Sequence, residues 1–175
     1  MKKFVLCAAV AAVMLFSACS ADVLNPKPDI DKCFTAKAQI AAGGEVIAGE
    51  LSRTAENCWV LSVTEPFALE GMTVTLNGGE TSFSFLGYEC KADFSENTSS
   101  LLKIFAETYE AAADNISAYE NGVLEGMSES GEYSVMFGEN GVPETITAGG
   151  ISVKLSEWRE GTENTGDNGE LIMLE

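Results

Sequence analysis

The sequence contains no histidine. This absence excludes Ser-His-Asp and Cys-His catalytic systems, and it also excludes zinc or copper sites that depend on imidazole ligands. The P-loop, the dinucleotide-binding pattern G-x-G-x-x-G and the hydrolase pattern G-x-S-x-G are missing as well. We therefore predict a protein that is not an enzyme and that needs no metal or cofactor.

Basic residues are scarce. The chain of 175 residues has 10 Lys and Arg against 27 Asp and Glu, which gives a formal net charge of −17. A chain this acidic repels nucleic acid and anionic lipid headgroups, so we expect no nucleic-acid partner. We attribute the acidity to solubility rather than to cation binding, because no spaced set of oxygen ligands is apparent.

The N-terminal residues have the pattern of an export signal. Lys2 and Lys3 precede an apolar run from Phe4 to Phe16, and small residues then lead to Cys19. The run is shorter than the ~20 residues of a membrane span. The string Leu15-Phe16-Ser17-Ala18-Cys19 resembles the lipobox of bacterial lipoproteins, although Phe16 stands where that family usually has Leu.

The lipobox resemblance implies cleavage before Cys19 and acylation of its thiol. The protein would then be exported and anchored to a bacterial cell membrane by that lipid. An ordinary signal peptide and an uncleaved anchor are the alternatives. On the first interpretation, residues 1–18 are the signal peptide and 19–33 a lipidated tether, extended by Pro26 and Pro28. Residues 34–159 form one domain, and 160–175 form an acidic, disordered tail.

Alternating apolar residues predict strands on both sides of one helix. Strands are expected from Phe34 to Ile40, at 45–53, 59–64 and 72–76, and from Phe83 past Tyr88. Further strands are expected at 123–129, 133–137, 144–148 and 151–155. Residues 95–119 have helical periodicity, with Thr98 as its N-cap. The predicted class is α+β, mostly antiparallel β, with one helix packed across a curved sheet or unclosed half-barrel.

Three cysteines remain in the expected mature chain after Cys19 is acylated. Cys33, Cys58 and Cys90 allow three pairings, and their spacing fits no metal motif. We favour a Cys33–Cys58 disulfide, because both residues precede strands that we expect to run in the same direction. The alternative is that all three thiols are unbridged.

Two segments suggest a family of lipid carriers. Residues 58–66 (Cys-Trp-Val-Leu-Ser-Val-Thr-Glu-Pro) precede Leu69-Glu-Gly71-Met72, and residues 137–146 (Phe-Gly-Glu-Asn-Gly-Val-Pro-Glu-Thr-Ile) come later. With the strand–helix–strand order, these segments resemble the LolA and LppX-type carriers. The resemblance implies an unclosed barrel whose apolar cavity holds a lipid or another hydrophobic ligand.

The cavity interpretation gives a set of candidate lining residues on two strands and the helix: Trp59, Leu61, Val63, Phe83, Phe85, Leu101, Phe105 and Tyr109. We expect non-catalytic binding of a hydrophobic ligand. The alternative is a structural or protein-interaction module of the cell envelope, in which the same residues form a filled core and no ligand binds.

Overall fold

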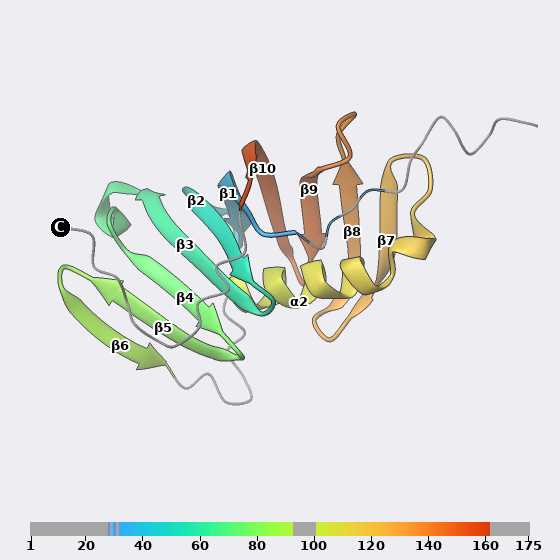
Figure 1. Ribbon diagram of the computed structural model, residues 1–175. Helices are drawn as coiled ribbons and strands as arrows, with labels where there is room; N and C mark the ends of the chain where they lie inside the picture. Colours follow the sequence, from blue (N-terminus) through green and yellow to red (C-terminus); the bar gives the residue numbers. More distant parts are fainter. Residues whose placement is uncertain (1–27, 29, 31, 93–100, 162–175) are drawn as a thin grey trace, which may run out of the picture.

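The computed structural model describes residues 28, 30, 32–92 and 101–161, which form one ten-stranded sheet with a helix against it (Figure 1). All neighbouring strands are antiparallel. The strands are β1 (Phe34–Ala42), β2 (Glu45–Ala55), β3 (Cys58–Glu65), β4 (Thr73–Asn77), β5 (Glu80–Phe85), β6 (Tyr88–Ala92), β7 (Val123–Ser128), β8 (Gly131–Phe137), β9 (Pro143–Ala148) and β10 (Ile151–Glu160).

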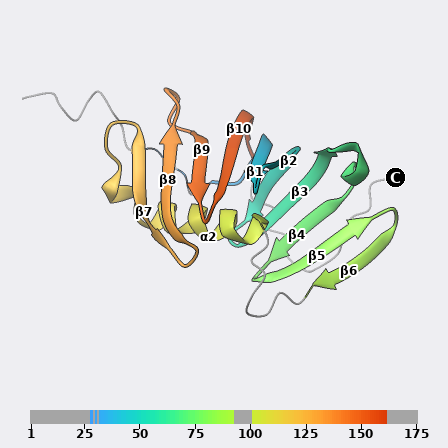
Figure 2. The same cartoon turned by 180° about the vertical axis from the view of Figure 1, so that it is seen from behind.

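The strand order in the sheet is β6-β5-β4-β3-β2-β1-β10-β9-β8-β7. The chain begins the sheet in its middle with β1 and adds β2 to β6 outward to one edge. Helix α2 (Leu101–Asp114) then crosses one face, and β7 to β10 build the other half until β10 pairs with β1. Because β6 and β7 are opposite edges, the sheet is not closed into a barrel (Figures 1 and 2).

The predicted fold class is confirmed, and several strands, among them β1, β2 and β10, run longer than predicted. Two elements differ in kind or in where they end. The strand expected from Phe83 past Tyr88 is a hairpin, because Leu86 and Gly87, with φ of 52° and 80°, turn the chain between β5 and β6. The helix ends at Asp114 because the backbone of Asn115 leaves the helical region, and the 3₁₀ turn η2 (Ile116–Ala118) follows. The predicted N-cap Thr98 lies outside the described residues.

We call the face that carries α2 the concave face of the sheet. Its centre is a cluster of aromatic side chains in which Phe34, Trp59, Phe105 and Tyr109 are at most 1% exposed. The ring centroid of Trp59 lies 5.2 Å from that of Phe105 and 5.0 Å from that of Tyr109, both edge-on. These contacts hold the helix directly on β3, and edge-to-face pairs of this kind add about 1 kcal/mol each beyond area burial.

The folded part begins before β1. Ile30 and Cys33, which belong to the predicted tether, are buried, and the carbonyl of Ile30 accepts a 2.6 Å hydrogen bond from the Tyr109 hydroxyl. At the other end, β10 continues to Glu160, and the amide of Gly161 donates to the Cys33 carbonyl. Cys19, the signal segment and residues 162–175 lie outside the described residues.

The predicted Cys33–Cys58 disulfide is not formed. Cys58 is a free thiol whose Sγ accepts a 3.2 Å hydrogen bond from Thr54 Oγ1. Strand β2 lies between β1 and β3, so the chain at Cys33 is about 9.5 Å from β3. This separation exceeds the ~7 Å limit between the Cα atoms of a bridged pair.

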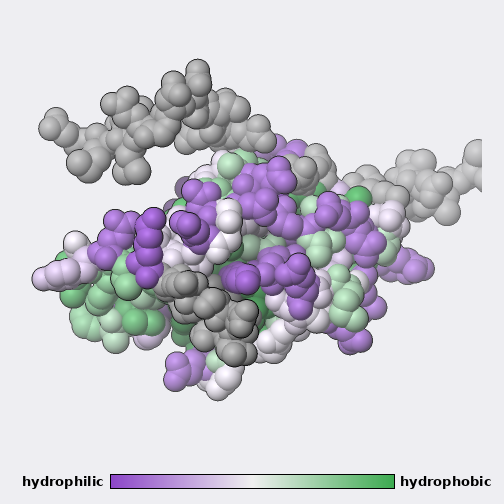
Figure 3. Space-filling model, turned by 90° about the horizontal axis from the view of Figure 1, so that it is seen from below, coloured by the Kyte–Doolittle hydropathy of each residue, from purple (hydrophilic) through white to green (hydrophobic). Residues whose placement is uncertain are grey.

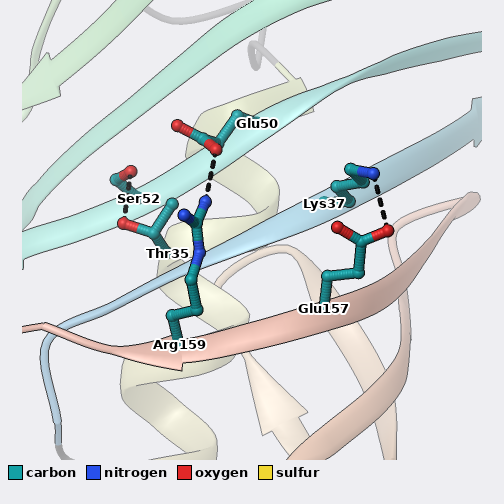
Figure 4. A network of polar contacts seen from close by, with 6 residues as sticks. All are labelled: Thr35, Lys37, Glu50, Ser52, Glu157 and Arg159. Atoms are coloured by element: carbon teal, nitrogen blue, oxygen red, sulfur yellow. Dashed lines mark hydrogen bonds and ion pairs between the residues drawn. The ribbon is translucent and has the colours of Figure 1, made fainter.

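The convex face carries polar pairs across β2, β1 and β10 (Figure 4). Lys37 pairs with Glu157 at 2.6 Å, and Arg159 pairs with Glu50 at 2.7 Å. A bulge in β10 sets Glu157 and Trp158 together opposite Ala36. The bulge lets Glu157 reach Lys37 on the convex face while Trp158 stacks on Phe34 on the concave face, with ring centroids 3.8 Å apart.

Candidate functional site

The candidate lining residues separate into two groups. Trp59, Leu61, Val63, Phe105 and Tyr109 are all buried in the central core cluster. In contrast, Phe83, Phe85 and Leu101 are half-buried, and Phe83 and Leu101 pack against the cluster from its margin. The structure therefore brings the helix residues and β3 together as a packed contact and leaves β5 at the periphery.

Helix α2 packs mainly on β7, β9, β3 and β4, so β5 and β6 extend beyond its principal contacts. The register of β4, β5 and β6 places one set of their side chains on the concave face. This set comprises Val74 and Leu76 of β4, Thr81, Phe83 and Phe85 of β5, and Tyr88 and Cys90 of β6. None of these seven residues is charged, whereas Glu80, Glu89 and Lys91 lie on the convex face.

Large apolar side chains gather at the turn end of the outer strands. Phe67 of η1 (Phe67–Leu69), Leu86 and Tyr88 are 87%, 79% and 81% exposed, and we call these three residues the apolar end. Figure 3 shows hydrophobic residues over the part of the molecule formed by β5 and β6. Single exposed apolar residues are common in folded proteins, whereas three large ones at the same end of a sheet make that end a candidate contact surface.

Leu86 has a second unusual property. Its φ of 52° lies in the left-handed region, which costs a residue with a side chain roughly 1 kcal/mol relative to glycine or asparagine. A two-residue hairpin turn with positive φ at both positions favours Asn-Gly, and this chain has Leu86-Gly87 there. Leu86 thus exposes apolar surface and adopts a costly backbone conformation, and neither feature stabilises the fold. Leu86 could not be predicted as a site residue from the sequence, because leucine carries no turn signal.

A separate hollow lies over β7 to β9. Its volume is about 660 Å³, and it is open to solvent. Its lining combines carboxylates with small and apolar residues: Glu125, Gly126, Met127, Glu132, Tyr133, Ser134 and Thr147. Within the described ranges, no group of three or more Cys, Asp or Glu residues is arranged to hold a metal ion. The hollow offers no cation to pair with an anionic ligand and no enclosed surface for an apolar one.

In the described part of the chain, no helix combines the length and the hydropathy that a transmembrane segment requires.

The chain is similar in structure to a LolA superfamily protein from Nitrosomonas europaea, with 12% sequence identity and a TM-score of 0.40. The match covers 81% of this chain and 94% of that one. No protein-family model matches the sequence, and no curated protein does so either. A likeness at this level of identity and TM-score says nothing about the ligand of this chain.

Proposed function

We propose that this protein binds the acyl chain of a lipid, without chemical reaction, along the concave face of β4 to β6. The observation that carries the proposal is the apolar end, where Phe67, Leu86 and Tyr88 are exposed beside the half-buried Phe83 and Phe85. Leu86 is the most telling of these residues, because it keeps an apolar side chain at a backbone position that favours Asn or Gly.

An extended hydrocarbon chain fits this surface better than a polar ligand does. The seven concave side chains of β4 to β6 include aromatic, aliphatic, Thr and Cys residues but no charged group, so no ion pair would anchor a charged headgroup among them. Burying apolar area contributes roughly 25 cal/mol per Å², which makes acyl-chain contacts the main source of affinity. A headgroup would remain in solvent at the margin of the sheet.

The proposal includes export and an acyl anchor at Cys19. Pro28 lies beside Gly141 in the turn between β8 and β9, since a Cβ added to Gly141 would be 3.9 Å from the Pro28 Cβ. This turn is far along the sheet from the apolar end (Figure 1). A tether that joins the domain near Pro28 would leave the apolar end free to meet a ligand. Replacement Cys19→Ala should release the protein from membranes, and an unchanged membrane fraction would contradict the anchor.

Native mass spectrometry of the full chain purified from membranes tests ligand binding. We expect a population whose mass exceeds that of the acylated protein by one lipid, and organic extraction should remove this added mass. If only ligand-free protein appears and added fatty acid yields no complex, the proposal is wrong.

A second candidate is an interaction module with a filled core. The direct contacts of Trp59 with Phe105 and Tyr109 favour it, because they occupy the centre of the concave face with protein side chains. In that case the apolar end would contact another protein. Chemical cross-linking would then recover a partner at Phe67 or Tyr88, and no lipid would be extracted.

A further inference from the structure

Strand β6 (Tyr88–Ala92) forms one edge of the sheet, and among the described strands only β5 pairs with it. Cys90 is the central residue of this five-residue strand and is exposed. Its immediate neighbours have opposite charges, Glu89 before it and Lys91 after it. An edge strand presents unpaired backbone groups that can pair with another strand.

The turn geometry determines which backbone groups of β6 face outward. Leu86 and Gly87 both have positive φ, as in a two-residue type I′ turn, so Phe85 and Tyr88 form a hydrogen-bonded pair. Because such pairs alternate along a hairpin, Cys90 is hydrogen-bonded to Phe83. The amide and carbonyl groups of Glu89 and Lys91 therefore point to the outer edge.

We propose that two copies of this chain associate through β6, antiparallel, about a two-fold axis at Cys90. All five residues of the strand then pair. Glu89 of each copy lies opposite Lys91 of the other in a hydrogen-bonded pair, so both charged pairs are attractive. The two Cys90 residues face each other as a non-hydrogen-bonded pair, with Cα atoms about 4.5 Å apart, a separation at which a disulfide can form.

Neighbouring registers of the same pairing are disfavoured. An axis at Glu89 places Glu opposite Glu, and an axis at Lys91 places Lys opposite Lys, so charge selects the register centred on Cys90. The other edge strand, β7 (Val123–Ser128), has a single charged residue, Glu125, so no two-fold pairing of β7 can form an attractive charge pair. Self-complementarity is therefore a property of the β6 edge.

Association through β6 would join the concave faces of two sheets into one surface. Tyr88 and Cys90 point to that face, while Glu89 and Lys91 lie on the convex side. The proposed interface depends only on the backbone register and the charge pattern of β6. It therefore goes beyond the proposed ligand binding, and its test is independent of the test of ligand binding.

Disulfide cross-linking of the full chain with oxidised glutathione at ~0.15 M salt tests the register. Two Cys90 thiols and one glutathione disulfide give one protein disulfide and two reduced glutathione molecules. We expect a covalent dimer joined at Cys90, identified by peptide mapping, and loss of this species in Cys90→Ser. Sedimentation velocity should still detect a dimer of Cys90→Ser.

Charge reversal is the decisive control. Glu89→Lys should slow cross-linking by roughly tenfold, because two attractive pairs become repulsive. The double change Glu89→Lys with Lys91→Glu should restore the wild-type rate. Equal rates in all three proteins, or no Cys90 cross-link, would overturn the proposal. A dimer that appears only after removal of residues 162–175 would also overturn it for the full chain.

Discussion

Arg53 and Glu110 form a two-point ion pair between the sheet and the helix. Arg53 Nη2 donates to Glu110 Oε2 at 2.8 Å, and Arg53 Nε donates to Oε1 at 3.1 Å. Arg53 is 3% exposed on β2, and its guanidinium carbon lies 5.7 Å from the ring centroids of both Trp59 and Tyr109. The pair therefore fixes α2 at one position on the concave face and keeps a buried cation neutralised.

We predict that Glu110→Ala lowers the free energy of unfolding by roughly 2–3 kcal/mol, because it leaves the buried Arg53 charge without this carboxylate. The chain offers a matched control in Glu50, which pairs with Arg159 at 2.7 Å on the exposed convex face. Glu50→Ala should cost at most about 0.5 kcal/mol. Urea unfolding followed by circular dichroism measures both values, and equal costs would show that burial of Arg53 is unimportant.

A substitution at Thr108 should raise the free energy of unfolding, whereas Glu110→Ala lowers it. Its side chain is fully buried, and its Oγ1 has no hydrogen-bond partner within the described structure. Thr108→Val keeps the shape and removes a polar group that burial has deprived of water, so we expect stabilisation by about 1 kcal/mol. Thr35→Val is the control, because it removes the 3.0 Å hydrogen bond to Ser52 and should be neutral or destabilising. A thermal melt that shows lower stability for Thr108→Val would contradict this reading.

Leu86→Asn should stabilise the isolated fold. Asparagine adopts positive φ more readily than leucine and completes the Asn-Gly pattern of a type I′ turn, so we expect a gain of roughly 0.5–1 kcal/mol. The measurement is the urea midpoint of the ligand-free protein, with Gly87→Ala as the reverse control, since it introduces a side chain at a φ of 80°. A loss of stability in Leu86→Asn would mean that the leucine side chain contributes to the fold itself.

Local pattern was enough to predict most strands and the helix. Trp59, Leu61 and Val63 alternate because one side of β3 is buried, and this alternation appears directly in the sequence. The central pairing of β1 with β10 was not predictable in the same way. Ala38 lies opposite Leu155, more than a hundred residues later, and no local signal marks such a contact.

Irregular backbone accounts for the remaining differences. Strict alternation would place Glu157 on the concave face after Leu155, but the bulge places Trp158 there instead. At the candidate site, periodicity correctly brought Trp59, Phe105 and Tyr109 to one face. It could not report that their rings fill the space between helix and sheet, because packing depends on side-chain volumes in three dimensions. The exposure of Phe67 and Tyr88 was not predicted either. It depends on which strands lie at the edge of the sheet, and the strand order is not a local property of the sequence.

The most direct test of the proposed function is titration of the full chain with a fluorescent fatty acid. We predict saturable binding of one molecule per chain, weakened about tenfold by Tyr88→Ser and also reduced by Leu86→Asn, because each change removes apolar contact area. Met127→Ser is the matched control, as Met127 is 66% exposed on the opposite edge strand, and it should bind like the wild type. Absence of saturable binding, or equal affinity in all four proteins, would contradict the account.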